Sequence, residues 1–303
     1  MPSGVQSGVI LNIPAPSSIF DLQSAVGASS YAPGMQISPF LHTCHQFIVI
    51  DECFFLYIGA FVESIPLGIS DSFGMHVNYW SPTNYNTPTN YDMLFGDGGT
   101  IENIPLISFL QRKVQNSILF LNYADPLQPS EVWNVTHDTR KYGQVSDALP
   151  SYFGIFIDKD SSILERCYDY SKNQVFDEKD YPKVILALQA AQKKGNGLIA
   201  SLNLTTVKND FWGIPEGFTS KITFVYLARL SSWEEKLSPD MQKLVKPPDG
   251  SNLADDIKTG PFEGFPHYTT LAGGINAERA NLLGNMVGWS VLENEELFRS
   301  LCE

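Results

Sequence analysis

Asp97 is the residue whose setting in this chain most favours chemistry. It follows the apolar run Met93-Leu94-Phe95, stands between glycines, and is soon followed by Pro105, which suits the first turn of a helix. Glycines let a backbone approach a ligand closely, and a carboxylate held in such a turn can act as a general base. We therefore predict that Asp97 is catalytic and lies in a cleft at a strand end; the alternative is an ordinary Asp-Gly turn. The backbone of the predicted motif comprises Gly96, Gly98, Gly99 and Asn103.

The elements around Asp97 predict an α/β fold. The apolar run before it indicates a strand. Ile104, Ile107 and Leu110 recur at helical spacing, and residues 117–122 read as a second, buried strand. Strand, turn, helix and strand make a crossover, and ligands meet catalytic groups at such strand ends. The prediction for the whole chain is one partial α/β domain over residues 1–303.

The rest of the chain supplies further elements. Residues 76–92 are predicted to be a packed loop and residues 238–264 a surface excursion. A helix is predicted from Asp180, with Pro182 in its first turn; its inner face comprises Val184, Ile185, Leu188 and Ala191. Two strands are predicted next, over residues 198–207 and 221–230, and a long hairpin connection joins them. A last helix is predicted after Asn276, which caps it, and its apolar face carries Leu283, Met286 and Val287.

Composition excludes several classes of function. The net charge of −13 argues against binding to nucleic acid, which needs clustered Lys and Arg. The longest apolar run, residues 53–62, is too short to span a bilayer, so we predict no transmembrane segment. His42, Cys44 and His45, with Glu52, form the nearest approach to a ligand cluster, but such clusters are usually ordinary residues, and we predict neither a metal nor a cofactor. With no visible signal peptide and few cysteines, a location in the cytoplasm or at the periphery of membranes is favoured.

The segment Gly96-Asp97-Gly98-Gly99-Thr100-Ile101-Glu102-Asn103-Ile104-Pro105 resembles the Asp-Gly-Gly/Ala motif of patatin-like and cytosolic phospholipase A2-like acyl hydrolases. Shorter segments, among them residues 25–33 and 209–214, resemble other parts of those proteins, so the similarity covers most of the chain and is strongest over residues 94–122. The resemblance implies a three-layer sheet flanked by helices, here incomplete at its N-terminus. It also implies a lipid or phospholipid substrate, met at a membrane surface, and a Ser–Asp dyad. In that dyad a serine attacks the ester and Asp97 takes its proton.

The serine of this dyad is not evident. Its elbow needs the pattern Gly-x-Ser-x-Gly or Gly-x-Ser-Gly-Ser, and neither occurs. Ser29 and Ser70 come nearest, but Ser29 belongs to the small-residue segment that precedes the Asp. Ser70 lies too close to Asp97 to leave room for the intervening elements. We therefore expect this chain to carry the general base and the C-terminal half of a lipid acyl hydrolase of the phospholipase or lysophospholipase type, inactive alone; the alternative is a non-catalytic relative that binds lipid or protein.

Overall fold

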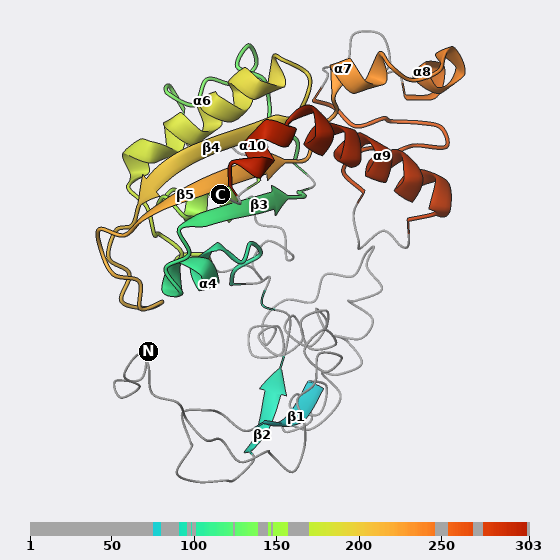
Figure 1. The fold of residues 1–303 in the computed structure, drawn as a ribbon. Helices are drawn as coiled ribbons and strands as arrows, with labels where there is room; N and C mark the ends of the chain where they lie inside the picture. Colours follow the sequence, from blue (N-terminus) through green and yellow to red (C-terminus); the bar gives the residue numbers. More distant parts are fainter. Residues whose placement is uncertain are drawn as a thin grey trace, which may run out of the picture. The chain divides into compact units, whose positions relative to one another are not determined.

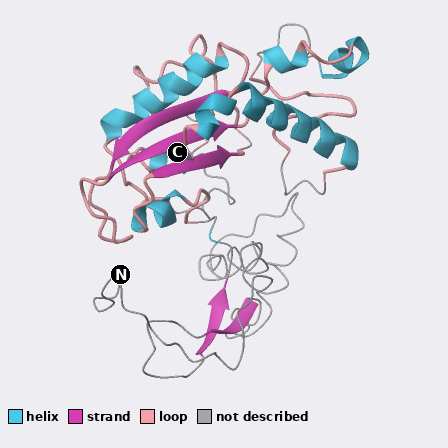
Figure 2. Cartoon of the chain, in the orientation of Figure 1, coloured by secondary structure: helices cyan, strands magenta, loops and turns pink. Residues whose placement is uncertain are grey.

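The computed structural model describes residues 75–79, 91–95, 98, 101–123, 125–138, 145–146, 148–156, 170–245, 254–268 and 275–301. The described residues belong to two compact units: those up to residue 103 belong to the first unit, and those from residue 104 onward belong to the second. Each unit is described by itself below. Figure 1 gives the labels of the helices and strands, and Figure 2 separates helix, strand and loop by colour.

The first unit contains a two-stranded antiparallel sheet. Strand β1 (Met75–Tyr79) pairs with β2 (Tyr91–Phe95), with Met75 opposite Phe95 and Tyr79 opposite Tyr91. The predicted strand before Asp97 is thus confirmed. The predicted loop over residues 76–92 is wrong at both ends, because Val and Tyr favour an extended, paired backbone over a packed loop.

The second unit contains a three-stranded sheet in the order β3-β5-β4. Strand β3 (Asn116–Leu121) runs parallel to β5 (Thr219–Tyr226), and β4 (Leu198–Thr205) runs antiparallel to β5. The predicted strands and the β4–β5 hairpin are confirmed with small shifts of their bounds. The predicted crossover is wrong, because among the described strands β2 pairs with β1, and β3 belongs to the other sheet. The coarse α/β prediction is confirmed by this mixture of helices with a small, partly parallel sheet.

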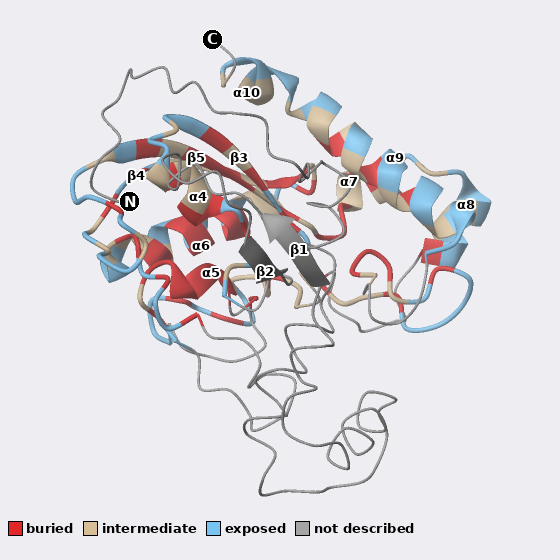
Figure 3. Ribbon diagram, turned by 90° about the horizontal axis from the view of Figure 1, so that it is seen from below, coloured by how far each residue is buried: buried red, intermediate tan, exposed pale blue. Residues whose placement is uncertain are grey.

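Helices lie on both sides of this sheet. Figure 3 shows α4 (Leu106–Gln111), α5 (Ala148–Ser151) and α6 (Tyr181–Gln192) on one side, and α9 (Ala277–Glu293) with α10 (Glu295–Arg299) on the other. Within the described ranges, the other helices are the 3-10 turn η5 (Glu178–Asp180), α7 (Ser231–Glu234) and α8 (Pro239–Val245). The sheet therefore forms the middle layer of the second unit.

The core lies between α6 and one face of the sheet. Register places Leu119, Phe224 and Ala200 side by side on that face, and all three are buried. The facing side of α6 is buried at Tyr181, Val184, Ile185 and Leu188, as its helical spacing predicted; Ala191, also predicted there, is only partly buried. Burial of such side chains is the main stabilising contribution to the fold.

The helix termini follow local chemistry. Asn276 caps α9, since its side-chain oxygen accepts the N–H of Arg279 at 2.8 Å. Asp180 takes the N-cap position of α6, but its side chain makes no capping bond and pairs with Lys183. Helix α4 begins one residue after Pro105 and ends before Lys113, whose φ of 54° leaves the helical region.

Residues 238–264 include the partly exposed helix α8 and several buried side chains. Val245, Ala254, Ile257 and Phe262 are each less than a tenth exposed and belong to the hydrophobic interior. This segment therefore packs part of its length into the second unit.

Two glycines in α9 weaken that helix without serving its packing. Gly284 and Gly288 are exposed, and a methyl group added at either would meet no atom within 4 Å. Glycine in a helix interior costs about 0.8 kcal/mol relative to alanine, so Gly284→Ala and Gly288→Ala are each expected to raise the free energy of unfolding by about that amount. Chemical denaturation measures the change.

Gly197 is the matched control for these substitutions. Its φ is 149°, and an added Cβ would lie 2.6 Å from the Ser290 Oγ atom. Gly197→Ala is therefore expected to lower the stability. Equal effects at all three glycines would contradict the packing described for α9.

Candidate functional site

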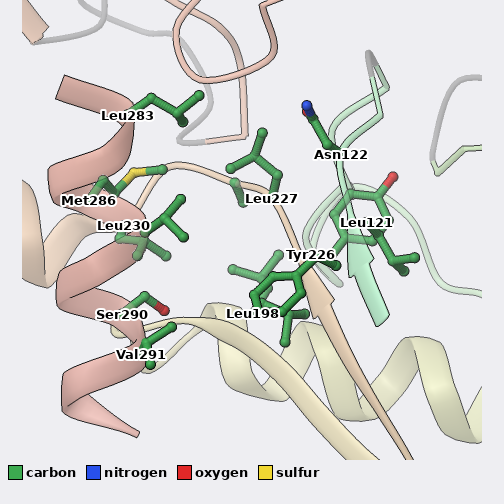
Figure 4. Close-up of a pocket in the computed structure, with 14 residues that line it drawn as sticks. Leu121, Asn122, Leu198, Tyr226, Leu227, Leu230, Leu283, Met286, Ser290 and Val291 are labelled. Carbon is green, nitrogen blue, oxygen red and sulfur yellow. The ribbon is translucent and has the colours of Figure 1, made fainter. Parts of the chain in front are cut away.

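A pocket lined by described residues lies at one edge of the three-stranded sheet. Register places Leu121, Tyr226 and Leu198 together at that edge, where the parallel strands β3 and β5 end and β4 begins. Helix α9 forms the opposite wall (Figure 4). The carboxyl ends of parallel strands are where open α/β sheets bind ligands. We call this hollow the strand-end pocket.

The strand-end pocket has a volume of about 220 Å³ and a mainly apolar lining. Its lining residues are Phe120, Leu121, Asn122, Leu198, Val225, Tyr226, Leu227, Ala228, Leu230, Leu283, Met286, Val287, Ser290 and Val291. None of these side chains carries a charge. Small-molecule sites have this character, with a few polar groups that fix orientation.

The polar groups of the lining are mostly engaged in the fold. The Tyr226 hydroxyl donates to the Asp125 carbonyl oxygen at 2.7 Å and accepts the Ser146 N–H at 3.1 Å. The Ser290 hydroxyl donates to the Asn196 carbonyl oxygen at 3.4 Å. Asn122, the first residue after β3, is exposed. The lining therefore offers apolar contact with a polar rim, and no acid or base of its own.

Residues 227–230, which follow β5, are held in place by polar contacts behind the pocket. The Leu227 N–H donates to the Leu121 carbonyl oxygen at 2.9 Å, which continues the pairing beyond the strands. Arg229, which is 4% exposed, forms two bonds of 2.8 Å to the Glu234 carboxylate and one of 2.7 Å to the Val245 carbonyl oxygen. The pocket wall on this side is thus preorganised.

His267 supports the same wall and is not free to act as a base. Its Nε2 atom lies 3.0 Å from the Leu227 carbonyl oxygen, which can only accept, so Nε2 carries a proton. Its Nδ1 atom lies 2.5 Å from an oxygen of Asp256. Both ring nitrogens are therefore occupied by partners within the fold. A Ser-His-Asp site at this histidine is not supported.

Two tyrosines that do not line the pocket have pKa values shifted from the ordinary value of a tyrosine. Burial raises the pKa of Tyr181, and the neighbouring Tyr226 raises it further. Burial also raises the pKa of Tyr268, while the Arg279 guanidinium acts in the opposite direction. Both phenols are therefore more firmly protonated than usual and are poor candidates for a general base.

Helix α9 is anchored beside the pocket by contacts at several points along its length. The Trp233 Nε1–H donates to the Asn285 Oδ1 atom at 2.9 Å, and the Asn294 Nδ2–H donates to the Asn196 carbonyl oxygen at 3.1 Å. Near its C-terminal end the helix approaches Gly197 so closely that a Cβ there would contact Ser290. These contacts fix the distance between α9 and the strand ends, and with it the width of the pocket.

The structure describes only part of the motif around Asp97. The Gly98 carbonyl oxygen accepts the N–H groups of Ile101 and Glu102 at 3.0 and 2.9 Å, which makes a turn after β2. Gly98 and Asn103 are both exposed. The other predicted site residues lie outside the described residues: Asp97, Gly96, Gly99, Ser29, Ser70 and the cluster of His42, Cys44, His45 and Glu52.

Ser290 lines the pocket and was not singled out by the sequence. It follows Gly288 and Trp289, a fragment of the elbow pattern, but it lies within α9 and not on a strand-to-helix turn. No charged side chain of the lining could take its proton. From the sequence, Leu283, Met286 and Val287 were predicted only as the apolar face of the last helix, and they form part of the pocket wall.

Comparison of the chain with protein-family models, with curated proteins and with solved structures found no match. In the described residues, no helix combines the length and the apolar character needed to cross a bilayer. Nor do the described parts of the chain bring together three metal-ligating side chains.

Proposed function

We propose that this chain carries the general base, Asp97, of a lipid acyl hydrolase of the phospholipase or lysophospholipase type that uses a Ser–Asp dyad. We also propose that the three-stranded sheet is part of a larger patatin-like sheet, which forms the middle of three layers with helices on both sides. The strand-end pocket is the observation that supports a lipid substrate, because it is apolar, uncharged and located where α/β sheets bind ligands. The motif from Gly96 to Pro105 supports the chemistry.

In this mechanism a serine Oγ attacks the ester carbonyl carbon while the Asp97 carboxylate takes the hydroxyl proton. The carbon–oxygen ester bond then breaks, and the leaving alcohol receives that proton. Water next attacks the acyl carbon while Asp97 takes a proton from the water. The bond between the acyl carbon and the serine Oγ then breaks, Asp97 returns the proton to Oγ, and the free acid leaves.

A second candidate is a non-catalytic relative that binds lipid through the same pocket. Two observations favour it: the sequence has no serine elbow, and the pocket lining has no acid or base. The two candidates share the ligand and differ in whether a bond is broken.

A serine-directed fluorophosphonate distinguishes these candidates. The reagent labels only an activated serine, and peptide mass spectrometry then locates the label. A hydrolase that contains the dyad serine is expected to be labelled at that one serine, in competition with a fatty-acyl ester. Label at Ser29 or Ser70 would identify the nucleophile within this chain. The absence of any label, together with binding of lipid, would favour the non-catalytic relative.

A further inference from the structure

We propose that the strand-end pocket accepts straight acyl chains of medium length, up to roughly nine carbon atoms, and that Leu283 and Val287 set this limit. The identification of the ligand as an acyl chain rests on the proposed function. The limit on length rests on the dimensions and the lining of the pocket.

The volume of the pocket sets the number of carbon atoms. An apolar protein cavity of about 150 Å³ holds one benzene ring, so that each carbon takes about 25 Å³. At the same density, the volume of about 220 Å³ holds roughly nine carbon atoms. A chain of sixteen or eighteen carbons, as in a common membrane phospholipid, would leave about half its length outside the pocket.

The lining determines which group enters. Eleven of the fourteen lining residues are aliphatic, aromatic or thioether side chains without a hydrogen-bonding atom, and the other three are Asn122, Tyr226 and Ser290. Tyr226 and Ser290 already donate to backbone carbonyl oxygens. An ionised head group inside would therefore lose its hydration without gaining a partner. The exposed Asn122 is the group placed to meet a polar end, which leaves the interior to the alkyl chain.

Helix α9 supplies the side chains that can change the limit. Leu283 and Val287 stand four residues apart on one face of the helix, and both line the pocket. Both are only partly buried, so a change of size at either alters the pocket more than the core. Met286, between them, is 1% exposed and extends toward Leu227 and Leu230 in Figure 4. Its methyl group is therefore a reporter of occupancy.

The test measures binding of a series of 1-alkanols, from hexanol to dodecanol, to the full chain. These ligands are uncharged and contain no ester, so binding is independent of hydrolysis and of Asp97. The methyl signal of Met286, in protein labelled at its methionine methyl groups and assigned through Met286→Leu, gives each Kd. The affinity is expected to rise about fourfold for each added methylene until roughly nonanol and then to stop rising.

Substitutions of the two wall residues should change the length of the best-bound alkanol in opposite directions. Val287→Phe is expected to shorten the best-bound chain by about three carbons, and Leu283→Ala to lengthen it by about three. Leu292→Ala is the control, because Leu292 is on the same helix, is 71% exposed and does not line the pocket. The Leu292→Ala variant should bind each alkanol with the affinity of the unaltered protein. Circular dichroism checks that each variant is folded.

The proposal would be overturned if no alkanol shifts the Met286 methyl signal, or if the affinity keeps rising by the same ratio for each methylene through dodecanol. It would also be overturned if Val287→Phe and Leu283→Ala are both folded and bind every alkanol with the affinity of the unaltered protein. The proposed hydrolase activity is tested separately, by the fluorophosphonate experiment. A chain with the expected limit but no activated serine would retain this pocket and lose that function.

Discussion

Replacing Arg229 with Met is expected to lower the free energy of unfolding by about 3–5 kcal/mol, the usual cost of removing one partner of a buried ion pair. The Arg229 side chain is fully buried, and Glu234, its partner at 2.8 Å, is 12% exposed. The substitution would leave the Glu234 carboxylate without its cation. It would also leave the Val245 carbonyl oxygen, at 2.7 Å from the guanidinium, without that donor.

The control for Arg229 is an exposed pair with similar chemistry. Arg299 donates through its Nε atom to Glu295 at 2.7 Å, and its side chain is 75% exposed. Water solvates both partners when such a pair is broken, so Arg299→Met should change the stability little. Urea denaturation of the two variants makes the comparison. An equal loss of stability in both would contradict the buried role of Arg229.

A double variant separates burial of charge from loss of packing. Replacing both Arg229 and Glu234 with apolar residues of similar volume removes the uncompensated charge. Such replacements are often neutral or stabilising. The Arg229→Met, Glu234→Leu protein is therefore expected to recover much of the stability lost in Arg229→Met. A double variant as unstable as the single one would show that the carbonyl bonds of Arg229 dominate.

The helices were predictable because their signals are local. Asn276 marks the start of α9 through a bond to an N–H three residues away, and Val184, Ile185 and Leu188 mark the inner face of α6 by their spacing alone. Those interactions lie within a few residues of chain. The same holds for the β4–β5 hairpin, whose strands are neighbours in sequence.

Strand pairing and the pocket required information that no local pattern contains. The strands β2 and β3 flank a helix and look like a crossover, but their partners are β1 and β5, and β5 begins far along the chain at Thr219. The pocket combines Phe120, Leu227 and Met286 from three distant segments. Each of these residues alone reads as ordinary core. The strand-end pocket therefore became visible only with the sheet register.

In an enzyme that contains this chain together with the dyad serine, replacing Asp97 with Asn is expected to lower kcat/KM for the hydrolysis of a medium-chain acyl ester by about 10²–10⁴-fold, the contribution typical of a general base. Asparagine has nearly the same shape as aspartate and keeps an acceptor oxygen, but it does not take a proton from a serine or from water. The turn after β2 depends on backbone bonds to the Gly98 carbonyl oxygen, which this change leaves in place. The fold and alkanol binding should therefore be unaffected.

The matched control for this loss is Asp210→Asn, which makes the same chemical change at another turn residue. The Asp210 side chain is 81% exposed, pairs with Lys208 and lies in the connection between β4 and β5. That connection joins the ends of the two strands opposite to the strand-end pocket, because the pocket lies where β4 begins and β5 ends. The hydrolysis rate of the Asp210→Asn variant should equal that of the unaltered protein. Full activity in Asp97→Asn would remove Asp97 from the mechanism. Equal losses in both variants would indicate an effect of charge and not of proton transfer.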